Sequence, residues 1–217
     1  MRRKGSLLKE FPILVVVALI VSLLIKTFLV QFFYIPSGSM ENTLQIKDRV
    51  AVNKIPFISR SIHRGDIVVF RDPANWLSEP FASESPIIIE KIREGLVAVG
   101  ILPNPTKQYL VKRVIGIGGD RVICCSKSKK LTINGKESTE PYIFEGNDPS
   151  DLNFDITVPA GKIWVMGDHR GASADSRYHQ DDINKGMVPL NRLTGRVVAV
   201  IWPFKSLKII SGFNSLR

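Results

Sequence analysis

The architecture of the chain is set by the stretch Tyr109-Leu-Val-Lys-Arg-Val-Ile-Gly-Ile-Gly-Gly-Asp120. Its β-branched and apolar residues, followed by a cluster of glycines, are typical of a β-strand that ends in a tight turn. Side chains alternate between the two faces of a strand, so Leu110, Lys112 and Val114 share one face. Similar runs recur and predict a mainly β fold, with strands at residues 49–52, 66–70, 109–117, 121–124, 131–133, 155–158, 162–166 and 196–202.

Turn signals separate these strands. The pair Asn134-Gly135 favours a tight hairpin directly after the strand that precedes it. The stretch 75–107 is different, because it contains four prolines and a helical pattern only at 87–99. We therefore expect this stretch to leave the β core as an excursion.

Lys112 is the unusual residue of the central strand. Among Leu and Val neighbours its charged form is disfavoured, which lowers its pKa from about 10.4 and leaves a neutral amine that can act as a base. The alternative is an ordinary strand lysine whose amine reaches solvent. The glycines that follow, Gly116, Gly118 and Gly119, fit neither the Walker nor the Rossmann spacing, so we exclude a nucleotide-binding loop.

The chain begins with a long apolar segment. Residues 11–25 carry no charge, and after Lys26 the apolar character resumes. A membrane crossing needs about 20 apolar residues, so we expect an uncleaved anchor at 11–31. A cleavable signal peptide has the same basic start, but it ends in small residues where this chain has three aromatic residues at 32–34. A buried core helix is the third interpretation.

Basic residues predict the orientation of this anchor. Arg2, Arg3, Lys4 and Lys9 precede it, and residues 27–46 contain no Lys or Arg. By the positive-inside rule, residues 1–10 form a cytoplasmic tail and residues 32–217 lie outside the cytoplasm.

Composition limits the classes of protein that fit. The chain has 217 residues, a net charge of +10 and a sequence pI near 9.8, which suits one domain with an appendage. Hydrophobic residues at 44% and charged residues at 23% exclude a disordered chain, a collagen-like repeat and a multi-pass membrane protein. Two adjacent cysteines and three histidines are too few for a structural zinc site, so we expect no metal and no cofactor.

A second segment, Ile35-Pro-Ser-Gly-Ser-Met-Glu-Asn-Thr-Leu44, directly follows the anchor. Pro36 holds its predecessor extended and Gly38 permits an unusual backbone angle, so together they can expose the Ser39 hydroxyl to a cleft. Ser-Gly-Ser sequences are more often simple loops, and this segment alone does not establish catalysis.

A third segment, Met166-Gly-Asp-His-Arg-Gly-Ala-Ser-Ala-Asp-Ser-Arg-Tyr-His179, is rich in Asp, Arg and Ser. This density predicts a hydrogen-bonded, ion-paired loop that supports a site. The segment also contains His169. Together with Ser39 and either Asp168 or Asp175, it offers a Ser-His-Asp triad as the alternative to a pair of Ser39 and Lys112.

Taken in order, these segments resemble bacterial type I signal peptidases, a family of Ser/Lys peptidases. The resemblance runs from the anchor to Trp202. It rests on motifs at Pro36-Ser-Gly-Ser-Met40 with Leu44, Asp48-Arg-Val with Asn53-Lys54, Arg64-Gly-Asp-Ile-Val-Val-Phe70, Lys112-Arg-Val-Ile-Gly with Gly119-Asp120, and Gly167-Asp-His-Arg with Ser173-Ala-Asp-Ser-Arg177.

The resemblance implies a fold, an activity and a location. The fold is a single N-terminal transmembrane helix followed by an extracytoplasmic antiparallel β-sheet domain at 32–217, with a smaller β subdomain inserted at about 120–160. The activity is removal of N-terminal signal peptides from exported preproteins, with cleavage after small residues in Ala-x-Ala-like sequences. The implied partners are these preproteins, the phospholipid bilayer of the bacterial cytoplasmic membrane and the nearby secretion translocon, with no nucleic acid.

The resemblance also assigns roles to individual residues. Ser39 is the implied nucleophile and Lys112 the general base of an acyl-enzyme mechanism. Ser37, with the Ser39 backbone N–H, supplies the oxyanion hole, and Ser173 orients the lysine. The remaining implied positions are a supporting ion pair, Asp175 and Arg177, and the walls of pockets for small residues, Ile35, Pro36, Met40, Leu44, Leu110 and Val111.

Some features depart from the family pattern. His169 stands where Asn is common, and residues 180–187 lengthen the connection after Arg177. Cys124 and Cys125 lie outside the motifs. A disulfide between these neighbours and two reduced thiols are both open.

Two other classes of protein compete with a peptidase. A self-cleaving repressor also pairs serine with lysine on a β fold, but it requires a soluble DNA-binding domain where this chain has an apolar segment. A membrane-tethered binding module is attracted to anionic headgroups by a charge of +10 and requires no serine or lysine of the motifs.

Overall fold

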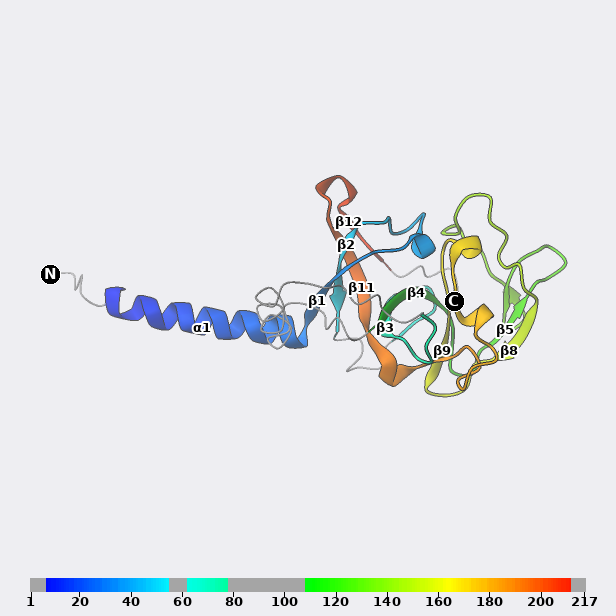
Figure 1. Ribbon diagram of the computed structural model, residues 1–217, viewed down its shortest axis with the longest axis horizontal. Helices are drawn as coiled ribbons and strands as arrows, with labels where there is room; N and C mark the ends of the chain where they lie inside the picture. Colours follow the sequence, from blue (N-terminus) through cyan, green and yellow to red (C-terminus); the bar gives the residue numbers. More distant parts are fainter. Residues whose placement is uncertain (1–6, 55–61, 78–107, 212–217) are drawn as a thin grey trace.

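The computed structural model describes residues 7–54, 62–77 and 108–211 (Figure 1). In the N-terminal helix, the side chains described are those of residues 10–21. The expected excursion at 75–107 lies outside the described residues from 78 onward, and so does its predicted helix at 87–99.

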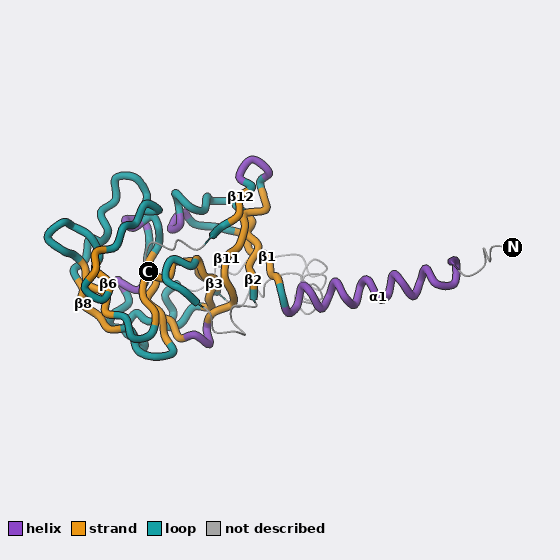
Figure 2. Tube along the Cα trace, turned by 180° about the vertical axis from the view of Figure 1, so that it is seen from behind, coloured by secondary structure: helices purple, strands orange, loops and turns teal. Residues whose placement is uncertain are grey.

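Helix α1 spans Leu7–Phe28 and extends away from the β-sheets (Figures 1 and 2). The large apolar side chains between Phe11 and Val21 are exposed. Within the described part of the chain, no helix combines the length and the hydropathy that a membrane crossing requires. Val30 and Gln31, the last two residues of the segment expected at 11–31, belong to the strand Val30–Tyr34, because they pair with Asn53 and Val52.

The main sheet is antiparallel, with the strand order β1-β2-β11-β3-β4-β9-β10 and with β12 beside β11. Because β11 lies between β2 and β3, the C-terminal part of the chain holds the N-terminal strands together. The strands are β1 (Val30–Tyr34), β2 (Arg49–Asn53), β3 (Ile67–Arg71), β4 (Tyr109–Ile117), β9 (Lys162–Met166), β10 (Val188–Pro189), β11 (Leu193–Trp202) and β12 (Lys208–Ile209).

Both faces of the main sheet are covered by apolar side chains. Strand β3 shows this directly: Ile67 and Val69 belong to one buried cluster, whereas Val68 and Phe70 belong to another. A strand buried on both faces reads as a continuous apolar run, as Ile67–Phe70 does, rather than as an alternation.

A second antiparallel sheet has the order β7-β6-β5-β8 and lies between β4 and β9 in sequence. Its side chains share one buried cluster with Trp164 and Met166 of β9, so the two sheets pack on each other. Asn134 and Gly135 both have positive φ and close the predicted hairpin. Its strands are β5 (Arg121–Cys124), β6 (Thr132–Ile133), β7 (Lys136–Glu137) and β8 (Phe154–Thr157).

Short 3-10 helices connect the strands. They are η1 (Gly38–Met40), η2 (Arg170–Ala172), η3 (Ser176–Tyr178), η4 (Leu190–Arg192) and η5 (Phe204–Ser206). Of these, η1 lies in the Ser-Gly-Ser segment, and η2 and η3 lie in the Asp- and Arg-rich segment.

The mainly β, antiparallel prediction is confirmed. Strands β4, β5 and β9 have the predicted bounds, and the other predicted strands differ by one to three residues. Strands β1, β7, β10 and β12 were not anticipated. Three of these strands have only two residues, which is too short to show a pattern. Strand β1 directly continues the apolar N-terminal segment, so its apolar residues could not be distinguished from that segment in the sequence. Cys124 and Cys125, for which two states were open, are joined by a disulfide.

Candidate active site

Ser39 and Lys112 meet in the interior of the protein. Ser39 lies in η1, Lys112 lies in the middle of β4, and 2.6 Å separates Oγ from Nζ. The two side chains are buried, with exposed fractions of 8% and 4%. A hydroxyl in direct contact with a buried amine is the arrangement that a nucleophile and its base require.

The turn that carries Ser39 is held at both ends. On its N-terminal side, Ile35 exchanges backbone hydrogen bonds with Lys47 and Asp48 at 2.9 Å each. On its C-terminal side, Met40 and Leu44 are fully buried in one cluster with Ile35. The apolar residues of the segment therefore fix η1 and leave the Ser39 hydroxyl directed toward β4.

The environment of Lys112 favours its neutral form. Burial is the main cause that lowers the pKa of Lys112 from 10.5 to about 8, and the charge of Arg177 lowers it further. Asp175 and Asp168 act in the opposite direction on this pKa. The predicted lowering of the pKa is therefore confirmed in direction and in cause.

A buried network lies beside the pair. Asp175 and Arg177 form an ion pair with Nε 2.9 Å from Oδ1, and both are buried. The Asp175 carboxylate also accepts hydrogen bonds from the Ser173 hydroxyl at 2.8 Å and from the Gly167 N–H at 2.9 Å. Among the described residues, the Ser173 hydroxyl makes its hydrogen bond to Asp175, and no bond to Lys112 is formed.

Asp168 does not serve a histidine. Its carboxylate receives Arg113 at 2.7 Å from Nε and 2.6 Å from Nη2, and Thr43 donates its hydroxyl to the same group. Asp168 and Arg113 are both buried. The Asp168 carboxylate thus connects Thr43, in the turn that follows Ser39, to Arg113, the residue that follows Lys112.

His169 lies next to Ser39 through its backbone rather than its ring. Its N–H donates to the Ser39 carbonyl at 3.2 Å. Its ring has Nδ1 3.0 Å from Glu41 Oε2 and stacks on Phe144 with 4.1 Å between ring centroids. Neither candidate carboxylate contacts this ring, so the alternative Ser-His-Asp triad does not form.

Gly167 is a site residue that sequence reasoning did not assign a role. A Cβ atom at this position would lie 2.3 Å from Ser173 Oγ and 2.4 Å from the Ser39 carbonyl oxygen. Only glycine allows this close approach of the strand end to the nucleophile. The sequence feature that could have identified Gly167 is its position at the start of the Gly-Asp-His-Arg motif, directly after a buried strand.

Ser37 precedes η1 in an extended conformation and is exposed. Although it is the N-cap residue, its side chain makes no capping bond. Its hydroxyl is therefore not committed to the helix that carries Ser39.

The residues expected to line substrate pockets divide into groups. Ile35, Met40 and Leu44 are buried in one cluster, and Val111 packs against that cluster. Leu110 belongs to the cluster on the other face of the sheet, and Pro36 is exposed. The structure thus brings four of the six together.

Two strand edges near the pair are free within the described residues. Strand β1 is the edge of the main sheet, and β4 pairs with β9 only from Arg113 onward, which leaves residues 109–112 unpaired on that side. Phe33 of β1 and Tyr109 of β4 are in edge-to-face contact with centroids 5.1 Å apart.

A cavity of about 290 Å³ opens next to the turn after Ser39. It does not reach Ser39 or Lys112. The described residues contain no cluster of side chains able to hold a metal ion. The residues that line the cavity are Asn42, Thr43, Arg113, Tyr142, Lys208, Ile209, Ile210 and Ser211.

Comparisons with known proteins agree on one family. The family model described as signal peptidase, peptidase S26, matches residues 8–202. A probable signal peptidase I of Mycobacterium leprae is 38% identical over 229 residues, which cover 93% of this chain and 78% of that protein. A signal peptidase I of Mycobacterium tuberculosis is 34% identical over 235 residues, which cover 97% of this chain and 78% of that protein.

A solved structure is also similar. A signal peptidase I from Enterococcus faecalis V583 is 23% identical, with a TM-score of 0.39, over 63% of this chain and 96% of that chain. This structural similarity is too weak to support an inference, and the relationship rests on the sequences.

Proposed function

The chain belongs to the signal peptidase family, peptidase S26, and is a serine-type peptidase that acts on peptide bonds; from this premise we propose a more specific function. It is a membrane-anchored endopeptidase that removes N-terminal signal peptides from exported preproteins. It cleaves after small residues through an acyl-enzyme formed by Ser39 and Lys112. The observation that carries this proposal is the buried contact of 2.6 Å between these two side chains.

The first step transfers a proton within this contact. Neutral Lys112 accepts the proton of the Ser39 hydroxyl while Oγ attacks the substrate carbonyl. With its pKa near 8, the amine is available as a base at mildly alkaline pH. The resulting ammonium then protonates the leaving amine, and a water molecule activated by Lys112 hydrolyses the ester.

The negative charge of the tetrahedral intermediate needs hydrogen-bond donors. Ser37, which has an uncommitted hydroxyl, and the Ser39 N–H are the two donors in this proposal. A single donor of this kind typically contributes about 3 kcal/mol to transition-state stabilisation.

Ser173 has a positioning role. Because its proton is donated to Asp175, its oxygen can only accept, and the amine of Lys112 is the donor that it would meet. An N–H held in this way turns the nitrogen lone pair toward Ser39. The ion pair of Asp175 with Arg177 keeps this acceptor in place.

The substrate binds as an added strand. The free edges of β1 and of residues 109–112 supply backbone hydrogen bonds, which give affinity without regard to sequence. We assign the walls of the substrate pockets to the buried apolar cluster of Ile35, Met40 and Leu44, against which Val111 packs. These walls leave room for small side chains such as alanine and exclude large ones.

The anchor is proposed from the sequence. Residues 11–31 are almost entirely apolar, and the described side chains of this segment in α1 are exposed rather than packed on the β-sheets. Burial of this surface in a bilayer is favourable, at roughly 25 cal/mol per Å² of apolar area. The catalytic domain then lies on the outer face of the membrane, near the translocon from which preproteins emerge.

Product analysis tests this function. The full chain in detergent micelles is incubated with a preprotein whose signal peptide ends in Ala-x-Ala, and the products are identified by mass spectrometry. We expect one cut after the second alanine, and no cut when that alanine is replaced by arginine. The proposed function is wrong if the wild-type chain leaves this preprotein intact or cuts both preproteins equally.

A further inference from the structure

A carboxylate lies next to the nucleophile and is not used in the mechanism above. Glu41 ends the helix that carries Ser39, and its N–H donates to the Gly38 carbonyl at 2.9 Å. Its side chain folds back over Gly38. A Cβ atom at Gly38 would lie 2.8 Å from Glu41 Cδ and 2.9 and 3.0 Å from the two carboxylate oxygens. Glycine at position 38 therefore makes room for this carboxylate.

His169 fixes the carboxylate in this place. Nδ1 of its ring is 3.0 Å from Glu41 Oε2, and the ring lies flat on Phe144. The backbone N–H of the same residue binds the Ser39 carbonyl at 3.2 Å. Glu41, His169 and the nucleophile are thus joined in one unit, and the position of the carboxylate follows that of Ser39.

The carboxylate stays accessible. Glu41 is 26% exposed and His169 is 20% exposed, whereas Ser39 and Lys112 are buried. Among the described residues, the hydrogen-bond partner of the Glu41 carboxylate is the His169 ring at Oε2, and Oε1 accepts no hydrogen bond. A ligand can therefore reach one oxygen of a charge that the protein holds in a fixed position.

Glu41 also differs from the other acids around the site. The carboxylates of Asp168, Asp175 and Glu140 are each paired with a buried arginine. An arginine partner offsets much of the charge that such a carboxylate would otherwise present to a substrate. Glu41 is paired with the imidazole of His169 rather than with an arginine, and its carboxylate is partly exposed. It is therefore the acid of this group that a charged side chain of a substrate can reach.

The location relates this charge to the substrate. In the proposed binding mode, residues before the scissile bond lie along the free edges of β1 and of residues 109–112 in β4. Glu41 covers Gly38 and His169 binds the Ser39 carbonyl, so both lie against the turn, and neither belongs to the strand edges assigned to the residues before the scissile bond. The residues that follow the scissile bond are the part of the substrate that these edges leave unassigned, and we place them beside Glu41.

We propose that Glu41, positioned by His169, forms a subsite for the first residues after the scissile bond and favours a cationic side chain there. This inference rests on the proposed function. The substrate class is a preprotein with lysine or arginine at the first or second position of the mature chain, and acidic residues at these positions are disfavoured.

Peptide substrates that differ in one residue test the subsite. Three peptides carry Lys, Gln or Glu at the first position after the scissile bond, and three more carry them at the second. The full chain in detergent should cleave the Lys peptide with a kcat/KM about tenfold above that of the Glu peptide at one of these positions. This ratio combines the attraction of Glu41 for lysine with its repulsion of glutamate, both between partly exposed charges. The ratio should fall severalfold between about 50 mM and 500 mM salt, because salt screens exposed charges.

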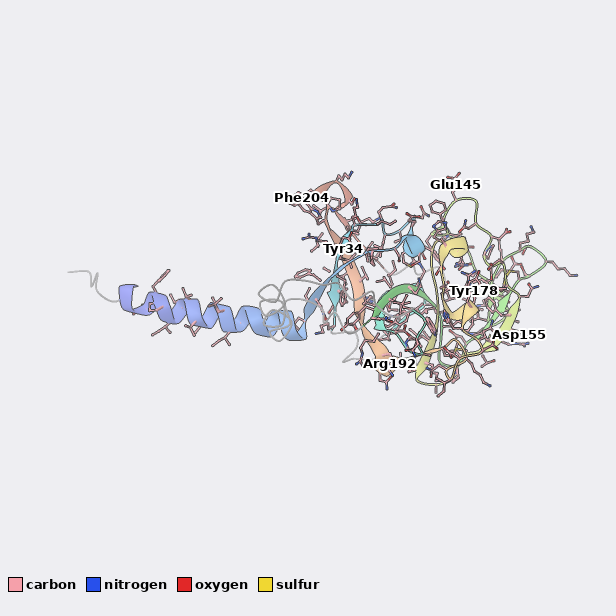
Figure 3. The ribbon with its side chains drawn as sticks, in the orientation of Figure 1. Tyr34, Glu145, Asp155, Tyr178, Arg192 and Phe204 are labelled. Atoms are coloured by element: carbon pink, nitrogen blue, oxygen red, sulfur yellow. A yellow bond between two sulfur atoms is a disulfide. The ribbon has the colours of Figure 1, made fainter. Side chains whose placement is uncertain are left out.

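Variants assign the preference to one residue. Glu41→Gln should reduce the Lys-to-Glu ratio to within about twofold, and Glu41→Lys should invert it, as expected for partly exposed charges. His169→Asn should give an intermediate ratio, because the carboxylate stays but loses its fixed position. Glu145→Gln is the matched control, since Glu145 is an exposed acid at the outer end of a loop (Figure 3), and it should keep the wild-type ratio.

The outcomes separate the two proposals. If the wild-type chain cleaves the peptides without any preference, or if Glu41→Gln keeps the full preference, the subsite is wrong and the proposed function stands. A salt-independent preference in the wild-type chain also contradicts the subsite, even where the variants fail to fold. If the wild-type chain cleaves none of the peptides, both the function and the subsite are overturned.

Discussion

The amine nitrogen of Lys112 lies 2.6 Å from the hydroxyl oxygen of Ser39, although 73 positions separate the two residues in the sequence. The contact is buried, so the proton is exchanged between the two side chains with little competition from solvent. It depends on a turn held by Met40 and Leu44 and on a strand in the middle of the main sheet. Buried packing and strand pairing are the kind of support that a reacting pair needs.

Removal of either partner should abolish cleavage. Ser39→Ala and Lys112→Ala should each lower kcat/KM for a preprotein by about 10³-fold or more, because nucleophile and base act as one unit. The double variant should be no worse than the single variants. Activity is measured on the full chain in detergent, and circular dichroism checks the fold.

The matched control for this prediction is Lys162→Ala. Lys162 is a half-buried lysine of β9 whose amine binds Asn184 rather than a residue of the pair. It should stay active. A Lys112→Ala variant with more than about a tenth of wild-type activity would rule out Lys112 as the base.

Gly167→Ala should damage the site through steric contact. The added methyl group collides with the Ser39 carbonyl, a backbone atom that cannot rotate away, and with Ser173. We expect a loss of about 1–3 kcal/mol in the free energy of unfolding and a fall in kcat that exceeds any rise in KM. Gly171→Ala is the control, because its methyl group would lie 3.6 Å from the nearest atom, an ordinary contact. Equal effects of both variants would contradict the close approach at Gly167.

Asp168→Asn should destabilise the protein strongly. It leaves the buried Arg113 guanidinium without its counter-charge, which typically costs about 3–5 kcal/mol in the free energy of unfolding, measured by urea denaturation. Asp155→Asn breaks an exposed ion pair with Arg121 on the outer surface (Figure 3) and should leave the unfolding midpoint unchanged. A small effect of Asp168→Asn would show that this pair does not hold the two parts of the site together.

The orientation of the proposed anchor predicts which residues can be labelled in cells. A cysteine placed at Glu145, an exposed position of the catalytic domain, should react with a membrane-impermeant thiol reagent added outside spheroplasts. A cysteine placed at Lys4 should react only after the membrane is opened, because the basic residues at 2–4 keep that end inside. The opposite pattern would overturn the orientation.

The strands of this fold were predictable because their signals are local. Runs such as Ile67–Phe70 and Lys162–Met166 are apolar and β-branched over the length of one strand, and the Asn134-Gly135 pair marks a hairpin within a few residues. Short strands such as β10 carry no such pattern. Their two residues become a strand only because β9 offers backbone groups to pair with.

The site was predictable only in part. The resemblance to a known family paired Ser39 with Lys112, but their distance depends on pairings between segments far apart, such as β2 with β11. The bond from Ser173 to Asp175 and the contact of Glu41 with His169 depend on the same long-range packing. Sequence spacing carries no information on which acceptor a hydroxyl will choose, so neither contact could be derived before the fold.

The pH dependence of kcat/KM tests the central claim most directly, since only neutral Lys112 can accept the Ser39 proton. With a folded pKa of about 8, lowered mainly by burial, the neutral fraction should rise from about one in ten near pH 7 to about nine in ten near pH 9. The account predicts a single ascending limb with an apparent pKa near 8 in the wild-type chain. A profile that is flat or descending between about pH 7 and pH 9 would contradict Lys112 as the catalytic base.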